Sequence, residues 1–285
     1  MDFLYQFRFG LDIEKLESYA DYLLGNNIFK GIEISANPFN EFDEYLVDYF
    51  KVLRKVINKY QPIVTAHLPV LDYGNRNQEV VDLMIDILKR SIADTREFGI
   101  KQYVLHAATT GNQDLSDRID LPEHKLIYDI AMSRRKEVYD RSISVIKELA
   151  VFTDKLDYDT HIGIENVLLD VEVVYSPEDQ INIIELANHP KINAVYDVGH
   201  ANRAKQNLQT FPSDIATHLG HIHINDNDGL CDLHALPGTL NKGMDYELVF
   251  NSLKQANYDG TMLIEAFYEN KESLVDAKEH LEKFM

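Results

Sequence analysis

Short apolar runs alternate along the chain with longer segments in which apolar residues recur every three or four positions. The short runs are typical of buried strands, and the longer period is typical of amphipathic helices. We predict strands at residues 5–9, 31–35, 63–67, 103–106, 161–167, 192–197, 221–225 and 262–266. We predict helices at residues 12–24, 41–59, 78–98, 124–153, from 176 onward, 213–219, 246–255 and 271–283.

This alternation continues from end to end without a linker rich in Pro, Gly or Ser, which predicts one domain over residues 1–285. Local signals agree, since Asp12 is suited to cap one helix and Ser176 another, with Pro177 at the first helical position. Eight strands alternating with eight helices predict an α/β fold, a (β/α)₈ TIM barrel of parallel strands. A doubly wound open sheet would also alternate.

An acid or a histidine closes seven of the apolar runs. These residues are Glu33, His67, His106, Glu165, Asp197, His223 and Glu265. Isolated ionisable side chains are costly to bury, so their repetition at strand ends indicates that they bind a common ligand. The simplest such ligand is a metal ion. Side chains at the ends of so many strands meet only if the sheet closes on itself, which favours the barrel over the open sheet.

The last four of these residues form the candidate metal site. Glu165, Asp197, His223 and Glu265 offer three carboxylates and one imidazole, a hard ligand set for Mn²⁺, Mg²⁺, Co²⁺ or Zn²⁺. A single acid at a strand end is more often a helix cap or an ion-pair partner, but four such coincidences are improbable.

Two further motifs extend the set. In Asp197-Val198-Gly199-His200, the glycine allows a tight turn that brings His200 back beside Asp197. The polar loop after His223 holds Asp232 and His234, although a loop rich in Asx residues is by itself ordinary turn chemistry.

Composition limits the binding partners and cofactors that the chain can have. The net charge of -19, from 47 acidic and 28 basic residues, disfavours nucleic acid, and the longest basic run is only Arg134-Arg135-Lys136, expected on a solvated helix face. The single Cys231 excludes an internal disulfide and a Cys-based zinc cluster. Without a membrane-length apolar run or the features of a signal peptide at the N-terminus, we expect a cytoplasmic protein with no membrane contact.

Along essentially its whole length the chain resembles the xylose isomerase-like TIM barrel superfamily. The motifs that carry the resemblance are Gly163-Ile164-Glu165-Asn166, Asp197-Val198-Gly199-His200, residues 223–234 and Ile264-Glu265. The superfamily includes isomerases and epimerases of sugars and sugar phosphates, inosose dehydratases, and the endonuclease IV type of apurinic-site nuclease (AP endonuclease family 2).

The isomerase and epimerase members imply one divalent metal (Mn, Zn, Co or Mg) on Glu165, Asp197, His223 and Glu265. There Glu165 and Glu265 also transfer protons, and the metal stabilises an enediolate derived from a small sugar, sugar phosphate or polyol. The resemblance makes His200 a substrate contact. His67 and His106 are expected to line the sugar pocket, Glu33 to contact substrate or form an ion pair in the barrel mouth, and Lys242 to reach the substrate from a mouth loop.

The resemblance to endonuclease IV implies an alternative, a zinc-dependent apurinic/apyrimidinic endonuclease. Its three zinc ions would use the positions matching His67, His106, Glu165, Asp197, His200, His223, Asp232, His234 and Glu265. Against it, Val167-Leu168-Leu169 replaces a small, Gly-containing run, the loop at residues 238–243 is longer than usual, and acids at Glu41, Asp43 and Glu44 would repel a phosphate backbone.

A third interpretation, a barrel that serves only binding or regulation, is opposed by the intact ligand set. The substrate, its phosphorylation, the metal and assembly into a homo-oligomer stay open at this stage.

Overall fold

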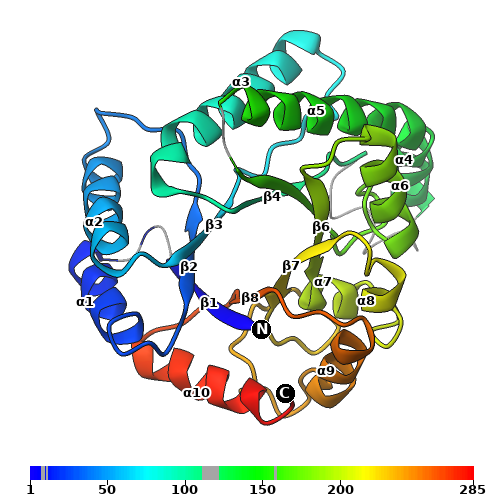
Figure 1. Ribbon diagram of the computed structural model, residues 1–285. Coiled ribbons are helices and arrows are strands. Elements are labelled where there is room, and N and C mark those ends of the chain that lie inside the picture. The colour runs from blue at the N-terminus through cyan, green and yellow to red at the C-terminus, as the bar shows by residue number, and fades with distance from the viewer. Residues whose placement is uncertain (8–9, 11, 111–121, 157–158) are drawn as a thin grey trace.

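Eight parallel strands form a closed barrel in chain order, with β8 paired to β1 (Figure 1). The computed structural model describes the chain except residues 8–9, 11, 111–121 and 157–158. The strands are β1 Asp2–Phe7, β2 Gly31–Ser35, β3 Ile63–His67, β4 Gln102–His106, β5 His161–Glu165, β6 Ile192–Asp197, β7 Leu219–Ile224 and β8 Thr261–Ile264. The predicted TIM barrel is confirmed, and the open sheet is excluded.

Helices form a ring outside the strands (Figure 1). In the described residues they are α1 Ile13–Leu23, α2 Glu44–Tyr60, α3 Gln78–Thr95, the 3-10 turn η1 Arg96–Phe98, α4 Pro122–Met132, α5 Arg135–Lys155, α6 Pro177–Ala187, α7 Val198–Arg203, α8 Phe211–Asp214, α9 Tyr246–Gln255 and α10 Lys271–Glu282. The predicted caps are confirmed: Asp12 accepts from the backbone of Glu14, and Ser176 forms a capping box with Asp179. None of the helices described is long and apolar enough to cross a membrane.

Two predictions of helix extent were wrong, and one helix was missed. The helix expected at residues 124–153 is two helices, since α4 ends at Met132 and α5 begins at Arg135, and the guanidinium of Arg134 between them donates to the carbonyl of Gly74. The helix expected at 213–219 is the single turn α8, since the chain already joins the sheet at Leu219. Helix α7, which starts directly after Asp197, was not predicted. Of the first expected strand, residues 8–9 lie outside the described residues.

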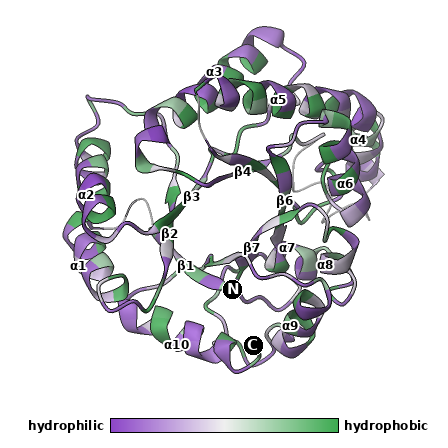
Figure 2. Ribbon diagram, viewed as in Figure 1, coloured by the Kyte–Doolittle hydropathy of each residue, from purple (hydrophilic) through white to green (hydrophobic). Residues whose placement is uncertain are grey.

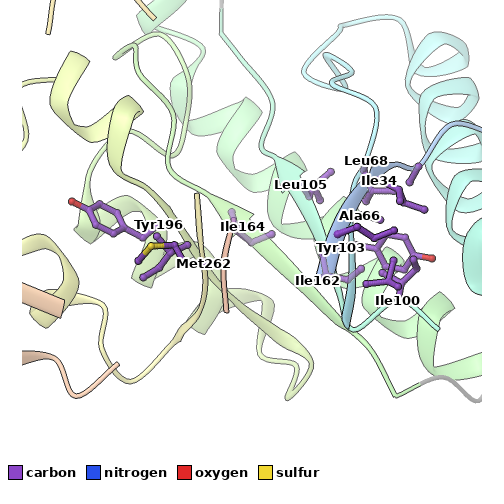
Figure 3. Close-up of a cluster of buried hydrophobic side chains, with 14 of the residues drawn as sticks. Ile34, Ala66, Leu68, Ile100, Tyr103, Leu105, Ile162, Ile164, Tyr196 and Met262 are labelled. Atoms are coloured by element: carbon purple, nitrogen blue, oxygen red, sulfur yellow. The ribbon is translucent and has the colours of Figure 1, made fainter. Parts of the chain in front are cut away.

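The main apolar core lies between the strands and the helix ring. Alternate strand residues point outward into it, including Ile34, Ala66, Tyr103 and Ile164 (Figure 3). The helices carry apolar and polar positions side by side, as an amphipathic outer layer requires (Figure 2). The other strand residues therefore point into the barrel, and many of these are polar.

Two side-chain amides form a hydrogen-bonded pair inside the barrel, near the N-terminal ends of the strands. The side chains of Gln102 on β4 and Asn193 on β6 donate to each other over 2.8 and 2.9 Å. Gly163 on β5, the strand between them, leaves the space for this pair.

We therefore expect Gly163→Ala to lower the free energy of unfolding by about 1–3 kcal/mol, the usual effect of overpacking an interior. Its Cβ would lie 2.1 Å from Gln102 Nε2 and 2.4 Å from Val195 Cγ2. Urea unfolding followed by circular dichroism measures the effect. Ser144→Ala, on the exposed side of α5, is the control and should be close to neutral. An unchanged midpoint for Gly163→Ala would contradict the tight packing around the amide pair.

Candidate metal centre

Four side chains from consecutive strands meet at the C-terminal end of the barrel. Glu165 ends β5, Asp197 ends β6, His223 lies near the end of β7, and Glu265 follows β8. All four are buried, and one ligand atom from each lies within 4.8 Å of those of the others. His223 Nδ1 lies 3.1 Å from Glu165 Oε1 and 2.9 Å from Glu265 Oε2.

These residues fit a divalent cation. Both carboxylate oxygens of Glu165, Oε2 of Glu265 and Nδ1 of His223 are buried without a hydrogen bond in the described part of the chain. Leaving such atoms unpaired is costly, and a hard cation satisfies all of them at once. Glu165, Asp197, His223 and Glu265 would therefore hold the ion, as the sequence indicates.

Protons balance this charge when no cation is bound. Burial lowers the pKa of His223, but Glu33, Glu265 and Glu165 outweigh burial and raise it well above its usual range. Burial raises the pKa of Asp197 to about 7, helped by the neighbouring carboxylates against the opposing effect of His200. A protonated His223 among carboxylates thus takes the place of a cation.

Asn166, a residue to which the sequence assigned no role, holds Asp197 in place. Its side chain donates to the Asp197 carbonyl over 2.9 Å and accepts from the Asp197 backbone over 2.8 Å. Its own carbonyl lies 2.9 Å from His200 Nδ1. The only signal in the sequence was its position directly after Glu165.

His200 does lie beside Asp197, but the reason for Gly199 differs from the predicted tight turn. Helix α7 begins at once after Asp197, and a Cβ on Gly199 would lie 2.0 Å from Asn225 Oδ1. Close approach to the Asn225 side chain therefore requires the glycine.

A second group surrounds Glu165. His67 Nε2 lies 3.3 Å and His106 Nε2 2.8 Å from Glu165 Oε2. Burial lowers the pKa of His67, but the Glu165 carboxylate outweighs burial and raises it to about 9. His67 Nδ1 is 2.7 Å from the Leu68 carbonyl, which orients the ring and directs Nε2 to Glu165.

A third group joins His200 to the polar loop after β7. Asp232 Oδ2 lies 3.7 Å from His200 Nε2 and 3.2 Å from His234 Nε2. His234 adopts a left-handed backbone with a φ of 43°, a conformation that is uncommon outside Gly and in which Asn, Asp and His are enriched. Asp226 fixes the same loop by accepting from the backbone of Gly238 and Met244.

A cleft of about 470 Å³ opens above these groups. It is lined by Gln6, Ser35, Asn37, His67, Leu68, Pro69, Val70, His106, Leu168, Glu172, His200, Asp232, His234 and Glu265. Lys242 does not line it and instead borders a separate pocket with Asp226 and His280. Glu33 is buried beneath the centre and does not line it either. Substrate contact by Lys242 or Glu33 thus stays a prediction that this geometry does not support.

Arg135 stabilises a loop that lines the cleft. The sequence had predicted a solvated helix face for Arg134-Arg135-Lys136. The Arg135 guanidinium instead donates to the carbonyls of Asp170, Glu172 and Val173 and to the carboxylate of Asp179. These bonds fix the loop between β5 and α6, which brings the largely buried Glu172 to the cleft. Burial raises the pKa of Glu172, while His106 and His200 oppose the rise.

Known proteins resemble the chain in sequence and in fold. The family of xylose isomerase-like TIM barrels matches residues 25–284. The uncharacterised protein MJ1311 of Methanocaldococcus jannaschii is 24% identical over 240 residues, covering 82% of this chain and 74% of that protein.

Several solved structures share the fold at low identity. A putative xylose isomerase from Rhodospirillum rubrum has a TM-score of 0.77 at 16% identity, covering 100% of this chain and 98% of its own. A D-tagatose 3-epimerase-like protein has a TM-score of 0.75 at 22% identity, covering 100% and 97%. The 3-keto-D-glucoside 4-epimerase of E. coli has a TM-score of 0.71 at 20% identity, covering 99% of both chains.

Metal binding should displace protons from the centre. Because the pKa of Asp197 is raised to about 7 and that of His223 is raised well above its usual range, protons compete with the ion at and below neutral pH. We expect the affinity for Mn²⁺ or Zn²⁺ to fall as pH drops, by about tenfold per pH unit for each proton displaced. Calorimetric titration in buffers of different ionisation enthalpy counts the protons. Binding without proton release near neutral pH would contradict this charge balance.

Proposed function

Since this chain belongs to the family of xylose isomerase-like TIM barrels, we propose that it is a divalent-metal-dependent isomerase or epimerase of a small sugar, sugar phosphate or polyol. One observation carries the proposal: two carboxylates from well-separated strands, Glu165 and Glu265, flank the same nitrogen of His223. The sugar epimerases among the similar structures support the same reaction class.

We assign proton transfer to the two glutamates, which reach the centre from separate strands. Glu165 comes from β5 and Glu265 from the end of β8, with β6 and β7 between them, so they approach from different directions. A bound divalent ion would polarise the substrate carbonyl and the neighbouring hydroxyl. One carboxylate then removes the proton next to the carbonyl, and the other returns a proton to the opposite face.

The two glutamates differ in their access to the cleft. Glu265 borders the cleft, whereas Glu165 is fully buried and contacts His67 and His106. We assign Glu265 as the group that meets the substrate first. His67, His106 and His200 line the cleft, where their imidazoles can donate hydrogen bonds to substrate hydroxyls.

A second candidate function, hydrolysis of abasic DNA, is favoured by one specific observation. Two of the further groups with metal-ligand spacing lie beside the cleft, His67–His106–Glu165 and His200–Asp232–His234. Clustered ions there would serve phosphodiester cleavage. We rank this function second, because a net charge of -19 repels a polyanion.

Replacing either proton-transfer residue should abolish sugar turnover. Glu165→Gln and Glu265→Gln keep the side-chain shape and lose charge and basicity, so we expect turnover to fall by about 10²–10⁴-fold or more. Deuterium uptake from D₂O by a panel of keto sugars measures proton transfer directly. Glu97→Gln, which removes an exposed ion-pair partner of Arg54, is the control and should exchange normally. Near-normal exchange in both active-site variants would refute the assignment.

Metal count and DNA cleavage separate the two functions. For the isomerase or epimerase we expect one tightly bound ion per chain and no cleavage of an abasic-site duplex by zinc-loaded or manganese-loaded protein. The physical reason is that duplex binding requires neutralising several phosphates. Elemental analysis and a gel assay at low salt provide the measurements. Efficient metal-dependent incision, with up to three zinc ions per chain, would instead establish the nuclease.

A further inference from the structure

A second layer of ionisable side chains lies inside the barrel directly beneath the metal centre. Glu33 on β2 and His221 on β7 are both buried, at 1% and 0% exposure, where barrel interiors are usually filled by apolar residues. The Thr65 hydroxyl donates to Glu33 Oε2 over 2.8 Å. His221 Nδ1 lies 2.7 Å from Thr261 Oγ1, and His221 Nε2 lies 3.5 Å from Glu33 Oε2.

His223 connects this layer to the metal centre through its two ring nitrogens. Nδ1 faces Glu165 and Glu265, whereas Nε2 lies 3.4 Å from Glu33 Oε2. A neutral imidazole carries one donor nitrogen and one acceptor nitrogen. The nitrogen that faces a metal ion must be the acceptor, so Nε2 must carry the proton and needs an acceptor of its own.

The other histidines show what His223 lacks. Nδ1 of His67, His200, His221 and His234 each lies within 3.2 Å of a backbone carbonyl, which fixes the tautomer. Neither nitrogen of His223 makes a hydrogen bond in the described residues. Of the charged groups placed around His223, only Glu33 faces Nε2.

We propose that Glu33 is a positioning residue whose carboxylate accepts the Nε2–H of His223 and so presents Nδ1 to a divalent ion held with Glu165, Asp197 and Glu265. This inference rests on the metal site of the proposed function and replaces the predicted substrate contact of Glu33. Thr65 donates to the same carboxylate oxygen over 2.8 Å, and His221 Nε2 lies 3.5 Å from it. The separation of 3.4 Å between His223 Nε2 and Glu33 Oε2 is long for a hydrogen bond, so the proposal rests on the direction in which Nε2 points and on the charge of Glu33.

The alternative is that Glu33, His221 and His223 hold an ion of their own, since their ligand atoms also lie within 4.8 Å of one another. His223 would then bridge two cations and lose both ring protons. Glu33 Oε2 already accepts from Thr65, which uses part of its capacity as a ligand. We therefore treat this second ion as an outcome that the test must exclude.

The test is the affinity for Mn²⁺ or Zn²⁺ of purified Glu33→Gln, measured by calorimetry with stoichiometry. Glutamine preserves size and can still accept from Thr65, but it has no negative charge to hold the Nε2–H. We expect the dissociation constant to rise about 10–100-fold, the usual effect of losing a partner of a metal-bound histidine, with the number of ions unchanged. Glu97→Gln, the same change at an exposed site, should bind as the wild type does.

Two results would overturn the inference. One is an affinity within about twofold of wild type in folded Glu33→Gln. The other is the loss of one whole ion per chain while the remaining ion binds normally, which would make Glu33 a ligand.

Nitrogen NMR of the zinc-loaded wild type gives a reading that does not depend on the variant folding. We expect the His223 signals to show a protonated Nε2 and a metal-bound Nδ1, and the reverse assignment would refute the role of Glu33. Wild-type protein that binds an ion but exchanges no sugar proton would refute the proposed function and leave this inference standing. Wild-type protein that binds no divalent ion would refute both.

Discussion

Several carboxylates are held close together at one buried point of the barrel, and their repulsion determines what surrounds them. Glu165, Asp197 and Glu265 lie together where water screens them little, so their mutual repulsion destabilises the site unless protons or positive charge offset it. The closed sheet supplies the rigidity, since each carboxylate is fixed at the end of its own strand. The surrounding histidines supply protons when no cation is bound, and a divalent ion can replace those protons.

This constraint explains why polar layers fill the barrel. Strand alternation sends every second residue inward, so the strands that deliver the carboxylates also deliver the residues below them. His221 lies beneath His223, and Glu33 lies beside both. The Glu33 carboxylate places a negative charge near Nε2 of each imidazole. Near the N-terminal ends of the strands, the barrel interior holds the uncharged Gln102–Asn193 amide pair. Charge is thus concentrated toward the cleft, where a ligand can reach it.

Much of this arrangement was predictable because it depends on local patterns. A strand-end residue such as Glu165 or Asp197 is found by counting along one apolar run, and its convergence with the others follows from barrel closure. Asn166 and Arg135 were not found, because their roles are hydrogen bonds to backbone groups on distant segments. The break between α4 and α5 has the same origin, since Arg134 reaches the carbonyl of Gly74. A loop residue such as Lys242 cannot be placed by pattern, because no strand fixes its direction.

The orientation of the imidazoles also explains how one ligand set can serve two chemistries. Four of the histidines, His67, His200, His221 and His234, have Nδ1 against a backbone carbonyl and turn Nε2 toward a carboxylate. An imidazole held in this way can donate from Nε2 to a sugar hydroxyl, or lose that proton and bind a metal ion. The choice depends on the charge of what enters the cleft. Under the proposed function, a neutral sugar would leave His67, His200 and His234 protonated beside their carboxylates, whereas additional cations would displace those protons. Among the described histidines, His223 brings Nδ1 nearest to the carboxylates, at 2.9 Å from Glu265 and 3.1 Å from Glu165. Under the proposed function it is therefore the histidine that binds the metal ion, while His67, His200 and His234, which line the cleft, can contact the substrate.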